Sequence, residues 1–424
     1  MTPGRAARWT LLFTLALAAC RPVGAPRTPG PAAAGETLPP ADEVRGLWVV
    51  RTTLGDPDAI REMVRRADEA GFNTLLVQVR GRGDAYYRSD LLPLAPAVAE
   101  RPGFDPLALV IDEAHRRGIE VHAWVNTYIV AGLGDLPEDP RHVVRAHPEW
   151  LAVPRDLARE LRAVDPRDPA YVQRLLAWAR EHRDRVEGLY LSPARPEVKE
   201  RIYRVWMELA RGYELDGIHF DYVRYPGPDF DYSPYAVDRF RRWVSRRLSP
   251  ARRAELERAS GGDPLAWPDA LPGPWDEFRR EQVSELVERV SYGVKADRPD
   301  LLVSAAVFAD PVDAVRYRYQ DWPSWVAEGL LDVVAPMAYT PDDERFRSLV
   351  ADAVERAGPR RVWAGIGAYQ TTPQGTLDKI DIARRQGAHG VLLFSYDWAV
   401  SEGGPIGDEP FLLGVGRRAF GGRR

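Results

Sequence analysis

Residues 216 to 226 read Asp216-Gly217-Ile218-His219-Phe220-Asp221-Tyr222-Val223-Arg224-Tyr225-Pro226, and they join a short strand pattern to a cluster of ionisable side chains. Side chains alternate along a strand, so if Ile218 and Phe220 pack outward against helices, His219 and Asp221 point together to the other face. Pro226 ends the strand. A buried carboxylate beside an imidazole needs partners, so the stretch predicts a functional site at the rim of a parallel barrel.

The rest of the chain repeats this strand pattern. From Arg45 onward, short apolar runs alternate with longer amphipathic stretches, which is typical of βα units. Gly71, Gly118 and Gly387 are predicted to end helices just before strands. The eight expected strands cover residues 46–52, 74–80, 120–126, 217–222, 302–308, 333–339, 362–368 and 391–396. They predict an α/β fold of the (β/α)8 TIM barrel type, and no Gly-x-Gly-x-x-Gly follows the first strand to favour a doubly wound sheet.

Two connections are too long for a simple βα unit. About 90 residues follow the third strand and about 80 follow the fourth. In a barrel these connections emerge at the catalytic face, so we expect large insertions after strands 3 and 4 that wall a cleft. The arginine-rich helix at 239–247 in the second insertion is interpreted as a solvated face. Residues 44–424 are expected to form one (β/α)8 domain.

The N-terminal residues predict export. Arg5 and Arg8 precede an apolar run at 9–19 that is too short to span a bilayer but suits a signal peptide. Leu17-Ala18-Ala19-Cys20 resembles a bacterial lipobox, and Cys20 is the only cysteine of the chain. We expect residues 1–20 to be a lipoprotein signal peptide, residues 21–43 a flexible tether, and the protein a membrane-anchored lipoprotein of the bacterial cell envelope. The alternative is a plain secretory signal with an incidental cysteine.

The amino-acid composition limits which classes of binding partner we expect. The 58 basic and 62 acidic residues give a net charge of −4, and no basic stripe with interleaved aromatic residues appears, so nucleic acid is not an expected partner. The 13 tryptophans and 17 tyrosines supply flat faces on which sugar rings stack, although ordinary core packing also uses them. The expected partners are a polysaccharide or oligosaccharide and, through the lipid, a membrane.

Polar and aromatic side chains gather at the expected carboxyl ends of the strands. Amides, arginines, carboxylates and aromatic rings on one face suit a polyhydroxylated substrate, which offers hydrogen-bonding edges and apolar C–H faces. The predicted substrate-binding residues are Gln78, Arg80, Asp84, Trp124, Asn126, Arg224, Tyr225, Tyr339 and Trp398.

Carboxylate chemistry is the reaction type that these residues favour. Only His122 and His219 lie at expected strand ends, and the chain contains no His-Glu-x-x-His and no paired cysteines, so no metal is expected. No Gly-x-Ser-x-Gly nucleophile elbow is present, and no cofactor is expected. What remains is a pair of carboxyl groups, of which one protonates a leaving oxygen and the other acts as nucleophile or activates water.

An ordered set of motifs resembles the glycosyl hydrolase-like family 10 proteins. The motifs are Arg45-Gly46-Leu47-Trp48, Phe72-Asn73-Thr74 through Gln78-Val79-Arg80, Gly83-Asp84-Ala85-Tyr86-Tyr87, His122-Ala123-Trp124-Val125-Asn126, Asp216–Pro226 and Ala335-Pro336-Met337-Ala338-Tyr339. The resemblance runs from about residue 43 to 400. It implies a (β/α)8 barrel and glycoside hydrolysis. Some bacterial members are envelope enzymes that cleave peptidoglycan glycan strands stripped of stem peptides.

The fourth strand is also distantly similar to the chitinase-type family 18 motif, Asp-x-x-Asp-x-Asp-x-Glu. Asp216 and Asp221 match its first and third acidic positions, whereas His219 and Val223 replace the second aspartate and the catalytic glutamate. Because Val223 is not an acid, the acetamido-assisted mechanism of that family does not carry over intact. Met337-Ala338-Tyr339 and Trp398 are similar to that family's sixth-strand and eighth-strand motifs. The seventh strand, 362–368, ends without the carboxylate of the double-glutamate barrels.

Two roles stay open for Asp221. As a catalytic carboxylate it needs a partner roughly 5–9 Å away, and as a structural residue it holds Arg224 or His219 in place. The candidate catalytic partners are Asp84, Asp310 and Asp397. His219 is predicted to orient groups or bind substrate, with proton donation as the alternative. The predicted function is an exported, lipid-anchored glycoside hydrolase, and the alternative is a catalytically inactive carbohydrate-binding barrel.

Overall fold

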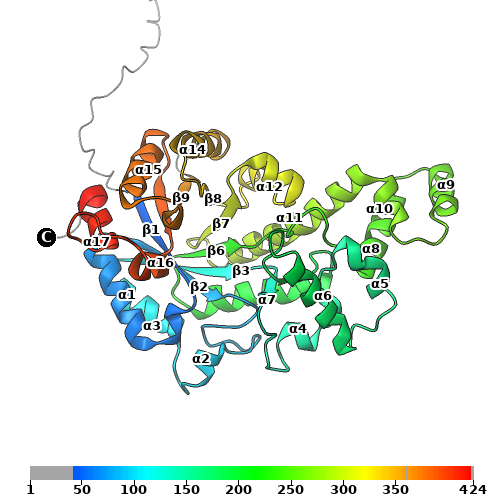
Figure 1. Cartoon of the computed structure of the whole chain (residues 1–424), viewed down its shortest axis with the longest axis horizontal. Coiled ribbons are helices and arrows are strands. Elements are labelled where there is room, and N and C mark those ends of the chain that lie inside the picture. The colour runs from blue at the N-terminus through cyan, green and yellow to red at the C-terminus, as the bar shows by residue number, and fades with distance from the viewer. Residues whose placement is uncertain (1–41, 359–360, 422–424) are drawn as a thin grey trace, which may run out of the picture. The chain divides into compact units, whose positions relative to one another are not determined.

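The computed structural model of the protein describes residues 42–358 and 361–421. Eight parallel strands form a closed barrel in the order β1-β10-β9-β8-β7-β6-β3-β2, so the predicted TIM barrel is confirmed (Figure 1). The barrel strands are β1 (Val44–Val49), β2 (Thr74–Arg80), β3 (Glu120–Asn126), β6 (Gly217–Asp221), β7 (Leu302–Phe308), β8 (Val333–Met337), β9 (Trp363–Gly367) and β10 (Gly390–Phe394). Each of them overlaps one expected strand.

Helices follow every barrel strand and cover the outside of the barrel. They are α1 (Pro57–Glu69), α2 (Pro96–Ala99), α3 (Pro106–His115), α7 (Pro196–Gly212), α11 (Pro272–Asp297), α12 (Pro311–Tyr317), α13 (Trp322–Ala327), α14 (Asp343–Ala357), α15 (Pro373–Arg385), α16 (Tyr396–Ser401) and α17 (Phe411–Val415). Gly71, Gly118 and Gly387 have φ angles of 76°, 70° and 83°. This left-handed conformation ends the helix before the strand, as predicted, because glycine lacks the Cβ that would disfavour it.

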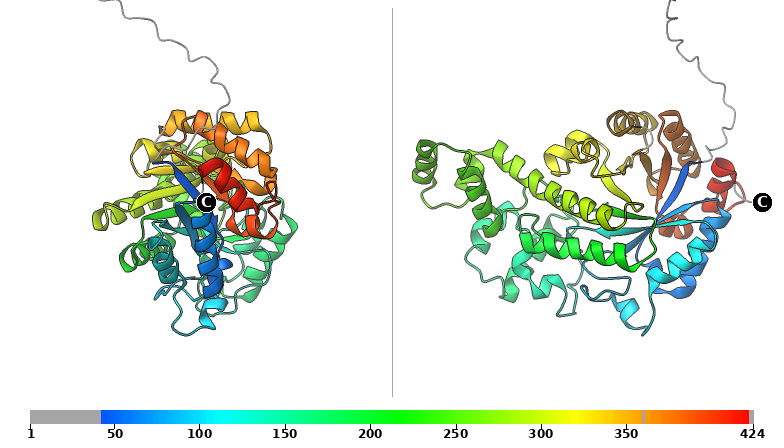
Figure 2. Two further views of the ribbon diagram at one scale, coloured as in Figure 1. Left: turned by 90° about the vertical axis from the view of Figure 1, so that its left-hand side faces the viewer. Right: turned by 180° about the vertical axis from the view of Figure 1, so that it is seen from behind.

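The two predicted insertions follow β3 and β6. The first holds the antiparallel strands β4 (Ile129–Ala131) and β5 (Leu189–Tyr190) with α4 (Val143–Ala146), α5 (Ala158–Leu161) and α6 (Pro169–Glu181). The second holds α8 (Pro234–Ser245), α9 (Pro250–Ser260) and α10 (Ala266–Ala270) before α11. The first insertion also holds two short turns, η2 (Pro148–Trp150) and η3 (Arg155–Leu157), and the rest of the chain holds η1 (Thr53–Gly55), η5 (Ala368–Gln370) and η6 (Gly416–Phe420). Both insertions extend from one side of the barrel, where α11 runs along α7 (Figure 2).

Strand β6 shows the predicted alternation of side chains. Phe220 faces outward and packs against Trp206 of α7, with ring centroids 4.6 Å apart, whereas His219 and Asp221 face inward. The inner face of the barrel is a packed core, as in other barrels of this type. Its buried apolar side chains are Trp48, Leu76, Trp124, Ala306, Val333, Ala335, Trp363 and Leu392. The barrel is therefore filled below its carboxyl-terminal rim.

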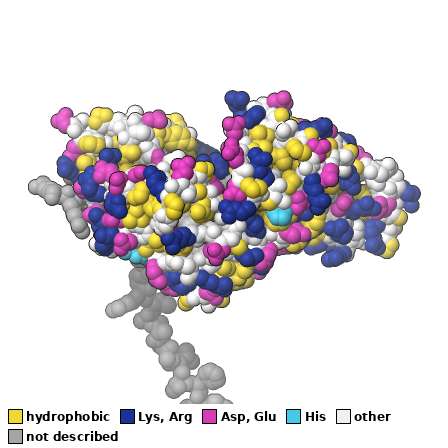
Figure 3. Space-filling model, turned by 90° about the horizontal axis from the view of Figure 1, so that it is seen from below, with side chains coloured by type: hydrophobic (Ala, Val, Ile, Leu, Met, Phe, Trp, Pro, Cys, Tyr) yellow, Lys and Arg dark blue, Asp and Glu magenta, His cyan; other side chains and the backbone are white. Residues whose placement is uncertain are grey.

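The described part of the fold includes the last residues of the predicted tether. Glu43, the last residue of that tether, is buried and forms an ion pair of 2.7 Å with Arg384 of α15. Cys20, the predicted signal peptide and the tether up to residue 41 lie outside the described residues. Among the described residues, no helix has the length and apolar composition needed to cross a bilayer. Basic and acidic side chains are interspersed on the face drawn in Figure 3.

Candidate active site

A cavity of 560 Å³ opens at the carboxyl ends of the barrel strands. Every barrel strand, or the residues just after it, contributes to its wall. Its charged lining residues are Arg51, Arg82, Glu187, Asp221 and Arg224, and its aromatic ones are Trp48, Trp124, Tyr222, Phe308, Tyr339, Tyr369 and Phe394. The carboxyl-terminal face is where barrel enzymes carry their active sites, so this cavity is the candidate site.

Asp221 ends β6 as a buried carboxylate that is held on both oxygens. Oδ1 accepts hydrogen bonds from the backbone N–H of Tyr222 at 2.6 Å and from Nη1 of Arg224 at 3.3 Å. Oδ2 accepts a hydrogen bond from the indole N–H of Trp124 at 3.1 Å. Burial raises the pKa of Asp221, although Arg224, the Tyr222 amide and Trp124 each act to lower it. The arrangement fixes the carboxylate within the cavity wall.

The turn after β6 is strained in a way that serves this carboxylate. Tyr222 has a φ of +49°, which non-glycine residues seldom adopt. The turn lets the amide of Tyr222 bind the side chain of the preceding residue, Asp221. The guanidinium of Arg224 then lies 4.1 Å from the ring centroid of Tyr222 and 5.0 Å from that of Phe308. Such strain persists at functional sites when the surroundings enforce it.

Glu187 is the second carboxylate of the cavity, and the sequence interpretation missed it. It lies in the insertion after β3, two residues before β5, and it is exposed. Its Oε2 accepts a hydrogen bond from the hydroxyl of Tyr190 at 2.7 Å. Gly188 sets this position, because a Cβ there would lie 1.9 Å from the carbonyl oxygen of Ala131 in β4. The only signal in the sequence is the short apolar run that begins at Gly188.

His219 lies below the cavity and does not line it. Its side chain is fully buried, Nε2 accepts a hydrogen bond from the Trp48 indole at 3.1 Å, and Nδ1 lies 2.9 Å from Oγ of Ser304. Since an indole N–H only donates, Nε2 is the acceptor and Nδ1 carries the proton. Burial and the nearby His122 hold the pKa of His219 well below its usual range. His219 is therefore a neutral group that positions Trp48.

The structure brings five of the predicted substrate-binding residues to the cavity, namely Gln78, Trp124, Asn126, Arg224 and Tyr339. It places the other four elsewhere. Arg80 is buried and donates to the backbone carbonyls of Asn126 and Thr127, and Asp84 accepts the backbone amide of Arg82 at 2.9 Å. Tyr225 packs against Tyr319 and Trp398 against Phe411, with ring centroids 5.4 Å and 5.5 Å apart.

The three predicted carboxylate partners of Asp221 also lie away from the cavity wall. Asp310 caps α12 through the amides of its first turn and forms an ion pair of 2.9 Å with Arg345. Asp397 accepts hydrogen bonds from the amide of Val50 at 2.7 Å and from a threonine hydroxyl. Asp84 binds a backbone amide, as described above. Carboxylates that accept backbone amides at turns and helix ends stabilise those turns and helices. Glu187 lines the cavity instead of these three residues.

The insertions differ in what they contribute to the cavity. The first supplies Glu187, whereas the connection after β6 supplies only its first residues, Tyr222 and Arg224. The expectation that both insertions wall the cleft is therefore only half correct. The helices of the second insertion pack on one another, and Asp238, Asp263 and Asp269 form ion pairs with arginines of the first insertion.

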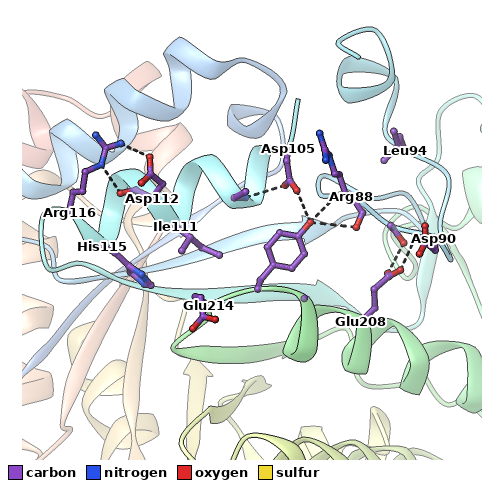
Figure 4. Close-up of a pocket in the computed structure, with 14 residues that line it drawn as sticks. Arg88, Asp90, Leu94, Asp105, Ile111, Asp112, His115, Arg116, Glu208 and Glu214 are labelled. Carbon is purple, nitrogen blue, oxygen red and sulfur yellow. Dashed lines mark hydrogen bonds and ion pairs between the residues drawn. The ribbon is translucent and has the colours of Figure 1, made fainter. Parts of the chain in front are cut away.

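A larger, open groove of 1160 Å³ lies outside the barrel between α3 and α7 (Figure 4). Two of its acidic side chains, Glu208 and Asp105, accept hydrogen bonds from neighbouring residues. Glu208 accepts hydrogen bonds from the Tyr87 hydroxyl, the Ser89 hydroxyl and the Asp90 amide, and Asp105 caps α3. The cavity at the strand ends is smaller, but it alone of the two combines strained backbone with a buried carboxylate whose pKa is raised. In the described part of the chain, no three histidine, cysteine or acidic side chains come together as metal ligands would.

Comparison with known proteins identifies the family. A model of the glycosyl hydrolase-like 10 family matches residues 43–362. The chain belongs to this family. Glycosyl hydrolase DigH of Escherichia coli is 31% identical over 294 residues, which are 64% of this chain and 55% of that protein. Glycosyl hydrolase YngK of Bacillus subtilis is 26% identical over 340 residues, 70% of this chain and 54% of that protein. The chain spans about half the length of these relatives.

Solved structures agree on the fold of this family member. The PgaB (BpsB) glycoside hydrolase domain from Bordetella bronchiseptica superimposes with a TM-score of 0.60 at 16% identity, over 89% of this chain and 99% of that one. A GH42 β-galactosidase from G. stearothermophilus gives a TM-score of 0.57 at 15% identity, over 89% of this chain and 56% of that one. These barrels show the fold alone. The family supports a glycosidase-type function and implies a carbohydrate substrate.

Proposed function

We propose that the protein is a glycoside hydrolase that cleaves O-glycosidic bonds with Asp221 and Glu187 as its two carboxyl groups. One observation carries the proposal. The two carboxylates among the described residues that line the cavity differ in setting, since Asp221 is buried and held on both oxygens while Glu187 is exposed. Two carboxyl groups in different environments are what glycoside hydrolysis requires.

The settings assign the roles. Glu187, which is exposed and accepts a hydrogen bond from the Tyr190 hydroxyl, protonates the departing glycosidic oxygen. If Asp221 is the nucleophile, Glu187 then takes a proton from the water that releases the glycosyl group, whereas if Asp221 is the base, Asp221 takes that proton. Asp221 faces the positive charge that develops on the sugar ring as the bond breaks, either as nucleophile or as base for the attacking water. Trp124 and Arg224 hold its oxygens in place, so this charge stabilisation requires no movement during the reaction.

The remaining lining residues suit a sugar. Gln78 and Asn126 place side-chain amides in the wall, linked by a hydrogen bond of 3.4 Å between Nε2 of Gln78 and Oδ1 of Asn126. Amides both donate to and accept from hydroxyl groups. Tyr339 and Tyr369, with ring centroids 6.0 Å apart, add aromatic faces on the opposite side of the barrel rim.

The test is turnover of defined glycans by the purified chain. We expect reducing ends to be released from peptide-free peptidoglycan strands, chitin or a plant-type glycan. Asp221→Asn and Glu187→Gln are each expected to lower kcat about 10²–10⁴-fold. The matched control is Glu181→Gln, an exposed glutamate of the same insertion that does not line the cavity. Absence of turnover on all these glycans, with a known hydrolase active beside it, would contradict the proposal.

The proposal includes export and a lipid anchor at Cys20, with a cell-envelope or extracellular polysaccharide as substrate. The support is the lipobox at residues 17–20 of the sequence. Tethering by lipid would keep the barrel beside an envelope glycan. In a bacterial host, the unaltered chain is expected in the membrane fraction, and Cys20→Ala is expected to leave it. Equal membrane retention of both forms would refute the anchor.

A carbohydrate-binding barrel without turnover is the second candidate. Val223 favours it, because this position holds the catalytic glutamate in the distantly similar chitinase-type motif. Glycan binding that is equal in the unaltered chain and in Asp221→Asn, with no hydrolysis by either, would select this candidate over the enzyme.

A further inference from the structure

Two arginine side chains line the cavity without an acidic partner among the described residues. Arg51 follows β1, and its Nη1 donates to Oε1 of Gln78 at 2.9 Å. Arg82 follows β2, and its Nη1 donates to the carbonyl oxygen of Gly81 at 3.0 Å. Arg224, by contrast, is paired with Asp221. A guanidinium has five N–H donors, so Arg51 and Arg82 both keep donors free for a ligand.

Gly81 holds the two arginines on the same part of the wall. A Cβ at residue 81 would lie 2.2 Å from Cδ and 2.7 Å from Nε of Arg51, so the side chain of Arg51 crosses directly over this glycine. Arg82 binds the carbonyl oxygen of the same residue, and Nδ2 of Asn126 donates to that oxygen at 3.0 Å. The two arginine side chains follow different strands, and both lie against the same residue, Gly81.

The charges that line the cavity do not balance. Arg224 and Asp221 neutralise each other, which leaves Arg51 and Arg82 against Glu187. Asp84, the acidic residue nearest to Arg82 in the chain, binds the backbone amide of Arg82 rather than its guanidinium. The excess is one positive charge when Glu187 is ionised and two when it carries the proton that it donates. A neutral glycan leaves this excess uncompensated in a half-enclosed cavity.

We propose that Arg51 and Arg82 form a subsite for a sugar carboxylate, so that the substrate is a glycan with acidic sugar units. A carboxylate matches the planar donor fork of arginine and offsets the excess positive charge of Arg51 and Arg82. The subsite rests on the proposed function in that the glycan occupies this same cavity.

The experiment compares the binding of matched glycans by calorimetry with the full chain. One pair is peptide-free peptidoglycan strands and the same strands with their carboxylates converted to methylamides. The other is hyaluronan oligosaccharides and their carboxyl-reduced form. At least one acidic glycan is expected to bind about tenfold or more tightly than its neutral partner. Arg51→Gln and Arg82→Gln are each expected to lower the affinity for the acidic glycan about tenfold and to leave the affinity for the neutral glycan unchanged. Arg51→Lys and Arg82→Lys are expected to retain part of the preference for the acidic glycan.

Arg242→Gln is the control, because this arginine lies on α8 in a separate surface hollow and its loss changes net charge equally. It is expected to change neither affinity. Equal affinities for both members of both pairs, or equal losses for the two members in the Arg51 and Arg82 variants, would overturn the subsite. Turnover tests the proposed function separately, since hydrolysis without charge preference refutes only the subsite, and charge-selective binding without hydrolysis refutes only the enzyme.

Discussion

The indole N–H of Trp48 donates to Nε2 of His219 at 3.1 Å, which joins a residue of the cavity wall on β1 to the buried imidazole of β6. On its other side the imidazole lies 2.9 Å from Oγ of Ser304, which donates to the carbonyl oxygen of Ile218 at 3.1 Å. Two residues further along β6, the carboxylate of Asp221 accepts a hydrogen bond from the indole N–H of Trp124. Two tryptophans of the cavity are thus oriented by two inward-facing residues of the same strand.

The Trp48–His219 bond predicts a graded loss of stability. His219→Leu leaves the buried indole N–H and the Ser304 hydroxyl without this partner, so the free energy of unfolding is expected to fall by about 1–3 kcal/mol or more. His219→Gln keeps an amide that accepts from the indole, so its loss is expected to be smaller. Urea denaturation at pH 7.5 measures both. Equal losses in the two variants would mean that the bond contributes little.

The buried imidazole also predicts how stability depends on pH. Burial and His122 hold the pKa of His219 well below its usual range, so the folded state stays neutral where the unfolded chain takes up a proton. The contribution of neutral His219 to the free energy of unfolding is therefore complete above the pKa of histidine in the unfolded chain, about 6.5. Below that pH the contribution decreases by about 1.4 kcal/mol for each pH unit. Urea denaturation at pH 7.5, 6.5 and 5.5 is expected to show a steeper loss for the unaltered chain than for His219→Gln. Parallel pH profiles would contradict this.

Arg224 is expected to control the acid limb of the pH–activity profile. It lowers the pKa of Asp221 more than the Trp124 indole does, against a burial effect that raises it. Arg224→Gln therefore raises this pKa, and activity that needs the ionised carboxylate is lost at higher pH than in the unaltered chain. Trp124→Phe is expected to move the limb less. The measurement is kcat/KM from pH 3 to 8 in all three forms, and an unmoved limb in Arg224→Gln would exclude Asp221 as the titrating group.

Gly188 is predicted to be essential for activity through the position of Glu187. In Gly188→Ala the new Cβ would meet the carbonyl oxygen of Ala131, so the β4–β5 contact must shift and carry Glu187 with it. A displacement of about 1 Å at a catalytic group lowers the rate about 100-fold. Gly134→Ala is the matched control, because a Cβ at this position of the same insertion meets nothing within 4 Å. Kinetics and thermal unfolding of both variants make the comparison, and normal activity in Gly188→Ala would count against a catalytic Glu187.

Tyr369 is expected to bind the substrate by stacking. It lines the cavity with 44% of its surface exposed, and its ring centroid lies 6.0 Å from that of Tyr339. Tyr369→Ala is expected to raise KM about 3- to 10-fold with kcat nearly unchanged, since a stacking contact is worth about 0.5–1.5 kcal/mol beyond its buried area. Tyr317→Ala serves as control, because Tyr317 is 51% exposed at the end of α12 and does not line the cavity. A lower kcat with unchanged KM would point to another role.

The strand pattern was sufficient to predict the barrel and part of the cavity wall. Residues that extend a barrel strand inward, such as Gln78, Trp124, Asn126 and Asp221, reach the cavity as predicted, because the alternation of side chains leaves them no other direction. Prediction failed where side chains lie beyond the last strand residue. Asp310 and Asp397 follow β7 and β10, but each accepts backbone amides at a turn or helix start instead.

The sequence by itself determined the eight βα units, their order, the position of the two insertions and the family, since periodicity and glycine helix ends are local properties of the chain. Only the tertiary structure decided which carboxylate joins Asp221. Glu187 is 34 residues before Asp221 in the chain and outside every barrel strand. It reaches the cavity because β4 and β5 pair across Gly188, and that long-range contact has no local signature.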